Sequence, residues 1–418
     1  MVKDYLKNPI FLSVVLCILI FYSGLFKIDV EQRFYSFYDS SKINFVYGEL
    51  DNSPVKNSSK KYYRALLNVK KIGFENNISS SSYGKMNIMI PSNLVEAFFP
   101  GKLYSSSRTK NNYLFESGGN YSFKGYFKNN VFYVTECTNC FWDKTFTGGF
   151  ARFRALCRLE FKRLMYSWGK AGGLLLALLS GAKEYTEDSV TQSFRNAGLA
   201  HILALSGMHL SMFSGIAMFI GKKTKRKRLS FIIRIFALFF FVWFAGLSPS
   251  LFRAYLCSML TLFASISDAE NPDMLLILCV SYLIQINIFP YDLFNTGLIL
   301  SYAALAGILI FSAPLKKFYS KILPDYFSAS LSASTGAQIF TAPVSLKTFG
   351  SFSPIGIIAT TIVSPLITIF IYIGLALIII SLIFPFISAY SGIFMNFLYT
   401  IIKYLVLAFS KVPLWRIN

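Results

Sequence analysis

The sequence predicts a polytopic α-helical membrane protein with a small external β domain inserted after its first transmembrane helix. Of its 418 residues, 54% are hydrophobic and 15% are charged, which is too apolar for a soluble enzyme of this length. Long apolar runs fill the chain from residue 200, and the polar stretch 28–150 separates them from a first apolar run. The net charge of +21 fits nucleic-acid binding, but membrane proteins also concentrate Lys and Arg in cytoplasmic loops.

The first apolar run, residues 9–26, is just long enough to span a bilayer. Lys3 and Lys7 precede it and favour a cytoplasmic N-terminus. A cleaved signal peptide is the alternative, but the run is long for one and no small-x-small site follows it. We therefore predict an uncleaved anchor in residues 1–27.

In residues 28–150, polar clusters typical of loops separate short runs in which every second residue is apolar. These runs predict short β-strands of a half-buried sheet. Behind a cytoplasmic N-terminus this domain would lie outside the membrane. Cys137 and Cys140 would then face an oxidising compartment and form a disulfide that closes a short loop. Redox chemistry and half of a metal site are the alternatives.

Residues 151–170 predict a basic amphipathic helix. Five basic residues recur among apolar ones at helical spacing: Arg152, Arg154, Arg158, Lys162 and Arg163. Such a helix lies on anionic lipid headgroups or guides a DNA strand. The following segment, 172–184, is too short to span a membrane and predicts a half-helix or a buried packing segment.

Two basic clusters orient the remaining helices. Residues 221–228 hold six Lys or Arg, a second cluster comprises Lys316, Lys317 and Lys321, and both should be cytoplasmic. Four apolar spans between them return the chain to the same side: 229–247, 250–267, 273–289 and 294–313. Three further segments, 327–346, 353–382 and 388–410, contain or adjoin the expected interruptions Pro343, Pro354, Pro365 and Pro385.

The stretch Arg195–Gly215 sets polar and helix-weakening residues into an apolar segment, which is a functional-site hypothesis by default. On a helix Ser206 and His209 are neighbours, while Gly207, Ser211 and Gly215 repeat every four residues on another side. The adjacent Ser206 and Gly207 predict a kink or an unwound turn. The pattern indicates either a transport path or tight packing.

A helix start is predicted at residues 248–253. Ser248 suits the N-cap, Pro249 the first helical position, and Arg253 follows one turn later, a combination that suits phosphate oxygens. The alternative is that Arg253 reaches the external interface or pairs with Asp292. The sequence has two histidines, no H-E-x-x-H and no second CxxC unit, so we expect no catalytic residues, no metal and no cofactor.

The segment AHILALSGMHLSMFSG resembles the signature of the ComEC competence family, membrane proteins that pass incoming single-stranded DNA across the inner membrane of transformable bacteria. The resemblance covers about residues 171–410 and continues through GLSPSLFRA, TGLILSYAALAGI and AQIFTAPVSLKTFGSFSPIGIIA. It implies an inner-membrane, multi-pass DNA channel in residues 171–418. Ile299 stands where relatives commonly carry Gln, which weakens the case for a polar network there.

The resemblance also implies site residues. The implied DNA path comprises His201, Ser206, Gly207, His209, Ser248, Arg253, Ser301 and Gln338. The family carries an OB-fold-like domain at the position of residues 28–150, and such a sheet binds single strands by stacking bases on aromatic rings beside basic side chains. The interleaved residues here are Tyr121, Lys124, Tyr126, Lys128 and Tyr133. Ordinary strand packing is the alternative.

The implied partners are single-stranded DNA, membrane lipids, a DNA receptor and a cytoplasmic motor. Many relatives continue into a metallo-β-lactamase-like domain, but no H-x-H-x-D-H motif occurs here, so we expect a channel form that relies on a separate nuclease. One alternative is a transporter or lipid-linked enzyme in which His201 and His209 do acid-base work. The other is a degenerate relative without transport activity.

Overall fold

The computed structural model describes residues 8–22, 34–35, 39–57, 61–74, 79–96, 114–223, 227–265, 272–413 and 415–416. The chain divides into two compact units. One, the barrel unit, comprises residues 29–173 and 182–185, and the other, the helical unit, comprises residues 1–28, 174–181 and 186–418. The lysines predicted to precede the first helix lie outside the described residues.

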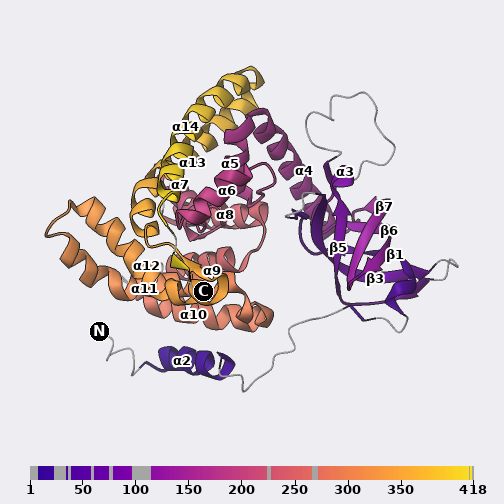
Figure 1. The fold of residues 1–418 in the computed structure, drawn as a ribbon, viewed down its shortest axis with the longest axis horizontal. Helices are drawn as coiled ribbons and strands as arrows, with labels where there is room; N and C mark the ends of the chain where they lie inside the picture. The colour runs from indigo at the N-terminus through magenta and orange to yellow at the C-terminus, as the bar shows by residue number, and fades with distance from the viewer. Residues whose placement is uncertain are drawn as a thin grey trace. The chain divides into compact units, whose positions relative to one another are not determined.

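A closed five-stranded β barrel forms the body of the barrel unit (Figure 1). Its strands are β1 (Ile43–Leu50), β3 (Tyr62–Phe74), β5 (Lys85–Pro91), β6 (Asn120–Lys128) and β7 (Val131–Phe141). Pairing runs β1–β3–β5–β7–β6 and back to β1; β5 and β7 are parallel and the other pairs antiparallel. The short strands β2 (Val55–Lys56) and β4 (Ser79–Ser81) also pair with β3. The predicted small β domain is confirmed.

Alternate residues along much of each long strand fill the barrel, and register shifts between β6 and β7 interrupt the alternation in β7. Val46, Leu67, Ile88, Phe123 and Phe132 are each 0% exposed and come from all five strands. Burying one such side chain contributes about 1.5–3 kcal/mol. The fold of this unit therefore depends on which set of alternate residues in each strand faces the barrel interior.

Two helices follow the barrel strands directly. Helix α4 (Phe146–Ser167) begins at the N-cap Thr145, whose hydroxyl accepts the Gly148 N–H at 3.2 Å. Helix α5 (Gly169–Ser180) starts at a glycine with φ +61°, and its residues 171–180 are all buried. The short apolar segment is thus a buried packing helix, one of its two predicted forms. A single turn, α3 (Ser92–Val95), follows β5.

The helical unit contains the predicted succession of apolar helices (Figure 1). Its helices are α2 (Pro9–Tyr22), α6 (Asp188–Asn196), α7 (Gly207–Lys223), α8 (Lys227–Ala245), α9 (Pro249–Ala264), α10 (Met274–Ile288), α11 (Thr296–Tyr319), α12 (Asp325–Phe349), α13 (Gly356–Ile383) and α14 (Ser388–Ser410). Among the described residues, four segments are long and apolar enough to cross a membrane: 228–245, 296–319, 356–383 and 385–410. Four helices, α8 to α11, separate the two basic clusters, but among the described residues only α8 and α11 of these four are long and apolar enough to be spans. The first apolar run, α2, is likewise a shorter apolar helix in its described part. Residues 224–226 of the first cluster lie outside the described residues.

Small residues let α11 and α12 approach at backbone distance. A Cβ added to Gly307 would lie 2.2 Å from the Gly336 carbonyl oxygen, so only glycine fits there. Ser328, Ser332 and Gly336 repeat every four residues along α12, and all three are buried. The pair follows the close packing that small residues permit between membrane helices.

Two of the four expected proline interruptions are wrong. Pro343 lies inside α12 and Pro365 inside α13, and both helices continue through them. Pro354 precedes α13, and Pro385 begins the 3-10 turn η4 (Pro385–Ile387) between α13 and α14. A proline removes one hydrogen bond of the helix and leaves a backbone carbonyl without its partner. In membrane proteins, neighbouring helices can satisfy such a carbonyl, so the helix can continue through the proline.

Candidate functional site

Arg253 lies at the centre of a buried polar region in the helical unit. It projects from α9, and its Nη1 donates to the Ser301 carbonyl oxygen of α11 at 2.8 Å. Its guanidinium carbon lies 5.9 Å from the centre of the Tyr302 ring. A Cβ added to Gly207, at the start of α7, would lie 3.2 Å from Nη2. Arg253 of α9 therefore lies where α7 and α11 meet its own helix.

This arginine is buried without a counter-ion among the described residues. The residue is 9% exposed, and its buried Nε has no hydrogen-bond partner in the described part of the chain. No described carboxylate lies at ion-pair distance from it, Asp292 included. The suggested pairing with Asp292 and the suggested escape to the interface are both wrong. A charge held inside an apolar bundle is costly and commonly serves a function.

Of the two forms predicted at Ser206 and Gly207, a kink or an unwound turn, the structure has the unwound one, and a helix starts directly after it. Residues 197–206 are non-helical, and α7 begins at Gly207. The Ser206 carbonyl oxygen accepts the N–H groups of His209 at 3.1 Å and Leu210 at 3.4 Å. The signature segment thus places an unwound stretch and a helix N-terminus beside Arg253.

His209 is 1% exposed on the first turn of α7. Its Nδ1 accepts the Ser206 N–H at 3.3 Å and lies 3.2 Å from the Ser206 hydroxyl oxygen. With Nδ1 accepting, the neutral ring carries its proton on Nε2, which is buried and lacks a partner among the described residues. Ser211, in contrast, is exposed, so Gly207, Ser211 and Gly215 do not form one closely packed face.

A chain of polar side chains continues from Arg253 across α9, α10 and α11, and the sequence did not reveal it. The Tyr302 hydroxyl donates to Gln285 Oε1 at 3.0 Å, and Gln285 Nε2 donates to the Pro249 carbonyl oxygen at 3.1 Å. Ser281 lies 3.3 Å from the Tyr302 hydroxyl. Gln285 and Ser281 are each 0% exposed. A lone Gln within the apolar α10 was the signal that could have found this network.

Gln338, another predicted path residue, lies in a second group of contacts, whose other members the sequence analysis did not name. A Cβ added to Gly356 would lie 2.9 Å from Gln338 Nε2, and one added to Gly198 would lie 2.9 Å from the Gly356 Cα. The Ser353 hydroxyl donates to the Asn196 carbonyl oxygen at 2.9 Å. The unwound stretch after α6 therefore packs on the start of α13.

The other predicted path residues lie in different settings. His201 is exposed within the non-helical stretch 197–206. Ser248 caps α9 as predicted, since its hydroxyl accepts the Leu251 N–H at 3.3 Å. Ser301 contributes its carbonyl oxygen to Arg253. The predicted path residues therefore do not lie together. Ser206, Gly207, His209 and Ser301 lie around Arg253, Gln338 lies in a second group, Ser248 is a helix cap and His201 is exposed.

The barrel residues predicted to bind DNA divide between its inside and its outside. Tyr121 is 0% exposed, and its hydroxyl donates to the Leu114 carbonyl oxygen at 2.6 Å, so its predicted stacking role is wrong. Tyr126 is 50% exposed and stacks on the half-buried Tyr133 with centroids 5.7 Å apart. Lys124 and Lys128 are exposed on the same strand as Tyr126. These four residues form the aromatic and basic face of the barrel.

The predicted disulfide is absent, and both cysteines are free thiols. Strand β7 runs through Cys137 and Cys140, which pair with Phe123 and Tyr121 of β6. A strand rises about 3.3 Å per residue. Three residues of strand exceed the roughly 7 Å between Cα atoms that a disulfide tolerates. The expected loop is an extended strand, so no short loop is closed.

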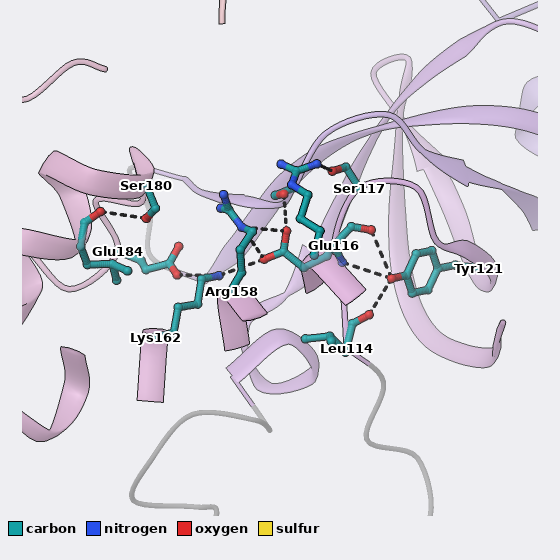
Figure 2. Close-up of polar contacts among 11 residues, drawn as sticks. Leu114, Glu116, Ser117, Tyr121, Arg158, Lys162, Ser180 and Glu184 are labelled. Carbon is teal, nitrogen blue, oxygen red and sulfur yellow. Dashed lines mark hydrogen bonds and ion pairs between the residues drawn. The ribbon is translucent and has the colours of Figure 1, made fainter. Parts of the chain in front are cut away.

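The basic helix α4 turns much of its charge inward, toward an ion cluster within the barrel unit (Figure 2). Glu116, next to β6, lies 3.3 Å from Arg158 Nε and 3.4 Å from Lys162 Nζ, and it accepts the Ser53 hydroxyl. Lys162 also lies 3.3 Å from Glu184. Lipid headgroups and DNA are therefore not the partners of these two basic residues.

The cluster changes the acid strength of Glu116. Burial alone would raise the pKa of this carboxyl, but Arg158, Lys162, the Ser53 hydroxyl and Arg154 outweigh it and lower the pKa to about 2. Glu116 therefore remains ionised at any physiological pH. Its ion pairs with α4 stay intact under the same conditions.

Comparison with known proteins assigns most of the helical unit. Residues 178–418 match the protein family described as "Competence protein". A region of 198 residues is 27% identical to "ComE operon protein 3" of Bacillus subtilis (strain 168) and covers 47% of this chain. That region spans only 25% of the relative's length. No solved structure matches the chain. Among the described residues, no group of three His, Cys, Asp or Glu side chains could hold a metal ion.

Proposed function

This chain belongs to the competence protein family, and on that premise we propose that it acts in DNA uptake as a membrane channel for a single strand of DNA. The observation that carries the proposal is Arg253, a buried cation without a described carboxylate partner, beside the signature segment at Gly207. A path for a polyanion needs positive groups that its own protein does not neutralise. Arg253 meets that need within an apolar helical bundle.

We further propose that the barrel is an OB fold and receives the strand before it enters the helical unit. The strand order β1–β3–β5–β7–β6, closed by β6 on β1 with a parallel β5–β7 pair, supports a five-stranded Greek-key barrel of this kind. Tyr126 and Tyr133 with Lys124 and Lys128 supply the stacking rings and basic groups that such barrels use on single strands.

The proposed setting is the bacterial cytoplasmic membrane, crossed several times, with the barrel on its outer side. Four sufficiently apolar segments support the membrane location. A strand moving inward requires a receptor that delivers it, a motor that pulls it and a nuclease that removes its complement. These three activities are proposed as separate partners.

The decisive test is deletion of the gene in its host, followed by uptake of labelled double-stranded DNA and measurement of label that reaches the cytoplasm. We expect DNA to bind the cell surface normally and cytoplasmic label to be lost, and a plasmid copy should restore it. Unchanged cytoplasmic uptake in the deletion strain would reject the channel and favour a relative without transport activity.

An acid-base enzyme or a transporter of another substrate is the competing function. Its key group would be His209, whose Nδ1 contacts the Ser206 N–H and hydroxyl and whose Nε2 has no hydrogen-bond partner among the described residues. His209→Gln keeps hydrogen-bonding capacity but removes the titratable ring. Retention of most DNA uptake in this variant agrees with a lining role, whereas complete loss at normal protein level would favour a protonation step.

A further inference from the structure

We propose that the first turn of α7 and the guanidinium of Arg253 together form a seat for one phosphate group of the passing strand. The inference rests on the proposed DNA channel and names the part of it that holds the backbone. It shifts the expected phosphate site from the start of α9, where the sequence suggested it, to the start of α7.

The first half of the seat is the N-terminus of α7, a helix of 17 residues. The N–H groups of a helix's first turn have no acceptor within the helix. Here the Ser206 carbonyl oxygen takes the N–H groups of His209 and Leu210. The N–H groups of Gly207 and Met208 remain at the positive end of the helix dipole, where anions bind favourably.

The second half is Arg253. One terminal nitrogen is occupied by the Ser301 carbonyl oxygen at 2.8 Å, while the buried Nε has no described partner. Nη2 lies against Gly207, only 3.2 Å from where a Cβ would stand. A donor nitrogen of α9 therefore lies beside the first residue of α7, and no described carboxylate forms an ion pair with Arg253. An anion with several oxygens suits this arrangement, because an arginine fork and helix N–H groups both donate to phosphate.

Gly207 allows the two halves to meet. A Cβ at this position would press on Arg253 Nη2 at 3.2 Å and on the Ala254 Cβ at 3.3 Å. Gly215, two turns along the same helix, offers a matched comparison, because its added Cβ would meet only the Tyr372 hydroxyl at an ordinary 3.6 Å. Substitution by alanine at the two positions therefore separates a change in the seat from a change in helix propensity.

Phosphate can reach the seat from DNA or from a lipid headgroup, so the test compares both. The full chain, purified in a phosphate-free detergent, is titrated with a short oligodeoxythymidylate, with its uncharged methylphosphonate analogue, and with phosphatidylglycerol. The thermal unfolding midpoint reports binding, because a ligand of the folded state raises it. Arg253→Gln is compared with Arg234→Gln, which removes an arginine from the neighbouring helix α8.

We expect the phosphodiester oligomer to bind more tightly than its neutral analogue, and Arg253→Gln to weaken that binding by about tenfold to a hundredfold. Arg253→Lys should recover part of the loss, and Gly207→Ala should show a smaller one. Arg234→Gln and Gly215→Ala should bind as the unmodified protein does. Equal oligomer binding by Arg253→Gln and the unmodified protein would overturn the seat.

An Arg253-dependent response to phosphatidylglycerol alone would also overturn it and identify a lipid site. Failure of the seat is distinct from failure of the channel. Loss of cytoplasmic uptake on gene deletion, together with unchanged oligomer binding by Arg253→Gln, rejects only the seat. Normal uptake in the deletion strain, together with Arg253-dependent oligomer binding, rejects only the channel.

Discussion

The ammonium of Lys403 lies 2.6 Å from the carboxylate of Glu187 and joins α14 to the residue that precedes α6. The Tyr399 hydroxyl donates to the same carboxylate at 3.2 Å. Both charged side chains are about three-quarters buried, at 27% and 26% exposed. Because α6 leads into the signature segment, this ion pair holds the start of α6, and with it the chain that enters that segment, against α14.

Loss of either partner should destabilise the helical unit. We expect Lys403→Gln or Glu187→Gln to lower stability by about 1–3 kcal/mol, between the values of exposed and fully buried pairs. The exchanged pair Glu187→Lys with Lys403→Glu should recover part of the loss. Thermal unfolding of the purified full chain measures this. A double variant no better than the worse single variant would show that the charge pairing does not matter.

Glu116 should control the acid stability of the barrel unit. Its folded-state pKa of about 2 lies below the ordinary 4.5. Its contribution to stability is therefore complete above pH 4.5 and is lost as the pH falls toward 2. Amide hydrogen exchange in β6 and β7 should accelerate over that interval in the unmodified protein and vary less with pH in Glu116→Gln.

Removing the charge of Glu116 should be costly at neutral pH as well. Glu116→Gln leaves Arg158 and Lys162 buried without this carboxylate, which costs about 3–5 kcal/mol. Glu160→Gln is the control, since Glu160 is exposed and forms an ion pair with Arg163 of the same helix; about 1 kcal/mol or less is expected. Similar losses in both variants would contradict a special role for the cluster.

The two sides of the barrel wall predict opposite consequences for two tyrosines. Tyr126→Ala should weaken binding of oligodeoxythymidylate by about 1–3 kcal/mol, because one stacking ring is lost. Tyr121→Phe should leave binding unchanged but cost about 1–3 kcal/mol of stability, because the Leu114 carbonyl and the Glu116 N–H lose their hydroxyl partner. Fluorescence anisotropy with labelled oligomer measures the first effect and thermal unfolding the second. Normal binding by Tyr126→Ala would count against this face.

The crossing of α11 and α12 should tolerate no side chain at Gly307. Gly307→Ala places a Cβ 2.2 Å from the Gly336 carbonyl oxygen and should cost about 1–3 kcal/mol through helix separation. Gly149→Ala is the matched control, because nothing lies within 4 Å of its added Cβ. That variant should be neutral or gain up to about 1 kcal/mol from helix propensity. Equal thermal unfolding midpoints for both variants would refute the close crossing.

The orientation predicted from charge can be measured by thiol labelling. In a background without the six native cysteines, a cysteine at Ser320, exposed beside the second basic cluster, should resist a membrane-impermeant reagent in spheroplasts. A cysteine at Tyr83, 70% exposed in the barrel unit, should react. Labelling at position 320 without permeabilisation would reverse the orientation.

Local signals were sufficient for much of the fold. Ser248 caps α9 as expected because capping depends on residues three positions apart. Apolar run length predicted a helix at each of α8 to α11, but among the described residues only α8 and α11 of these four are long and apolar enough to cross a membrane. The sequence also contained the information that excludes Tyr121 from the outer face. Tyr121 has an odd residue number in β6, whereas Lys124, Tyr126 and Lys128 have even ones, so Tyr121 faces the opposite side of the strand.

Long-range partners could not be predicted. Glu116 meets Arg158 from 42 residues away, and nothing near either residue specifies the other. Tyr302 meets Gln285 across two helices, although Ile299 had suggested that α11 lacks a polar network. Arg253 was expected to serve its own helix start, yet it reaches α7 and α11. In each case tertiary packing selects the partner. A single sequence can mark a residue such as Gln285 as unusual in an apolar helix, but it does not say which distant residue it meets.

The burial of residues 171–180 of α5 has a consequence for how the chain is made. Its residues 171–180 are all shielded, and within the helical unit Leu175 lies against Gly374 of α13, where an added Cβ would come within 2.7 Å. The ribosome completes α5 nearly two hundred residues before that neighbour, counted from positions 180 and 374. We expect α5 to wait at the insertion machinery or beside lipid until α13 arrives. Chains that end before α13 should therefore be recognised by quality-control proteases.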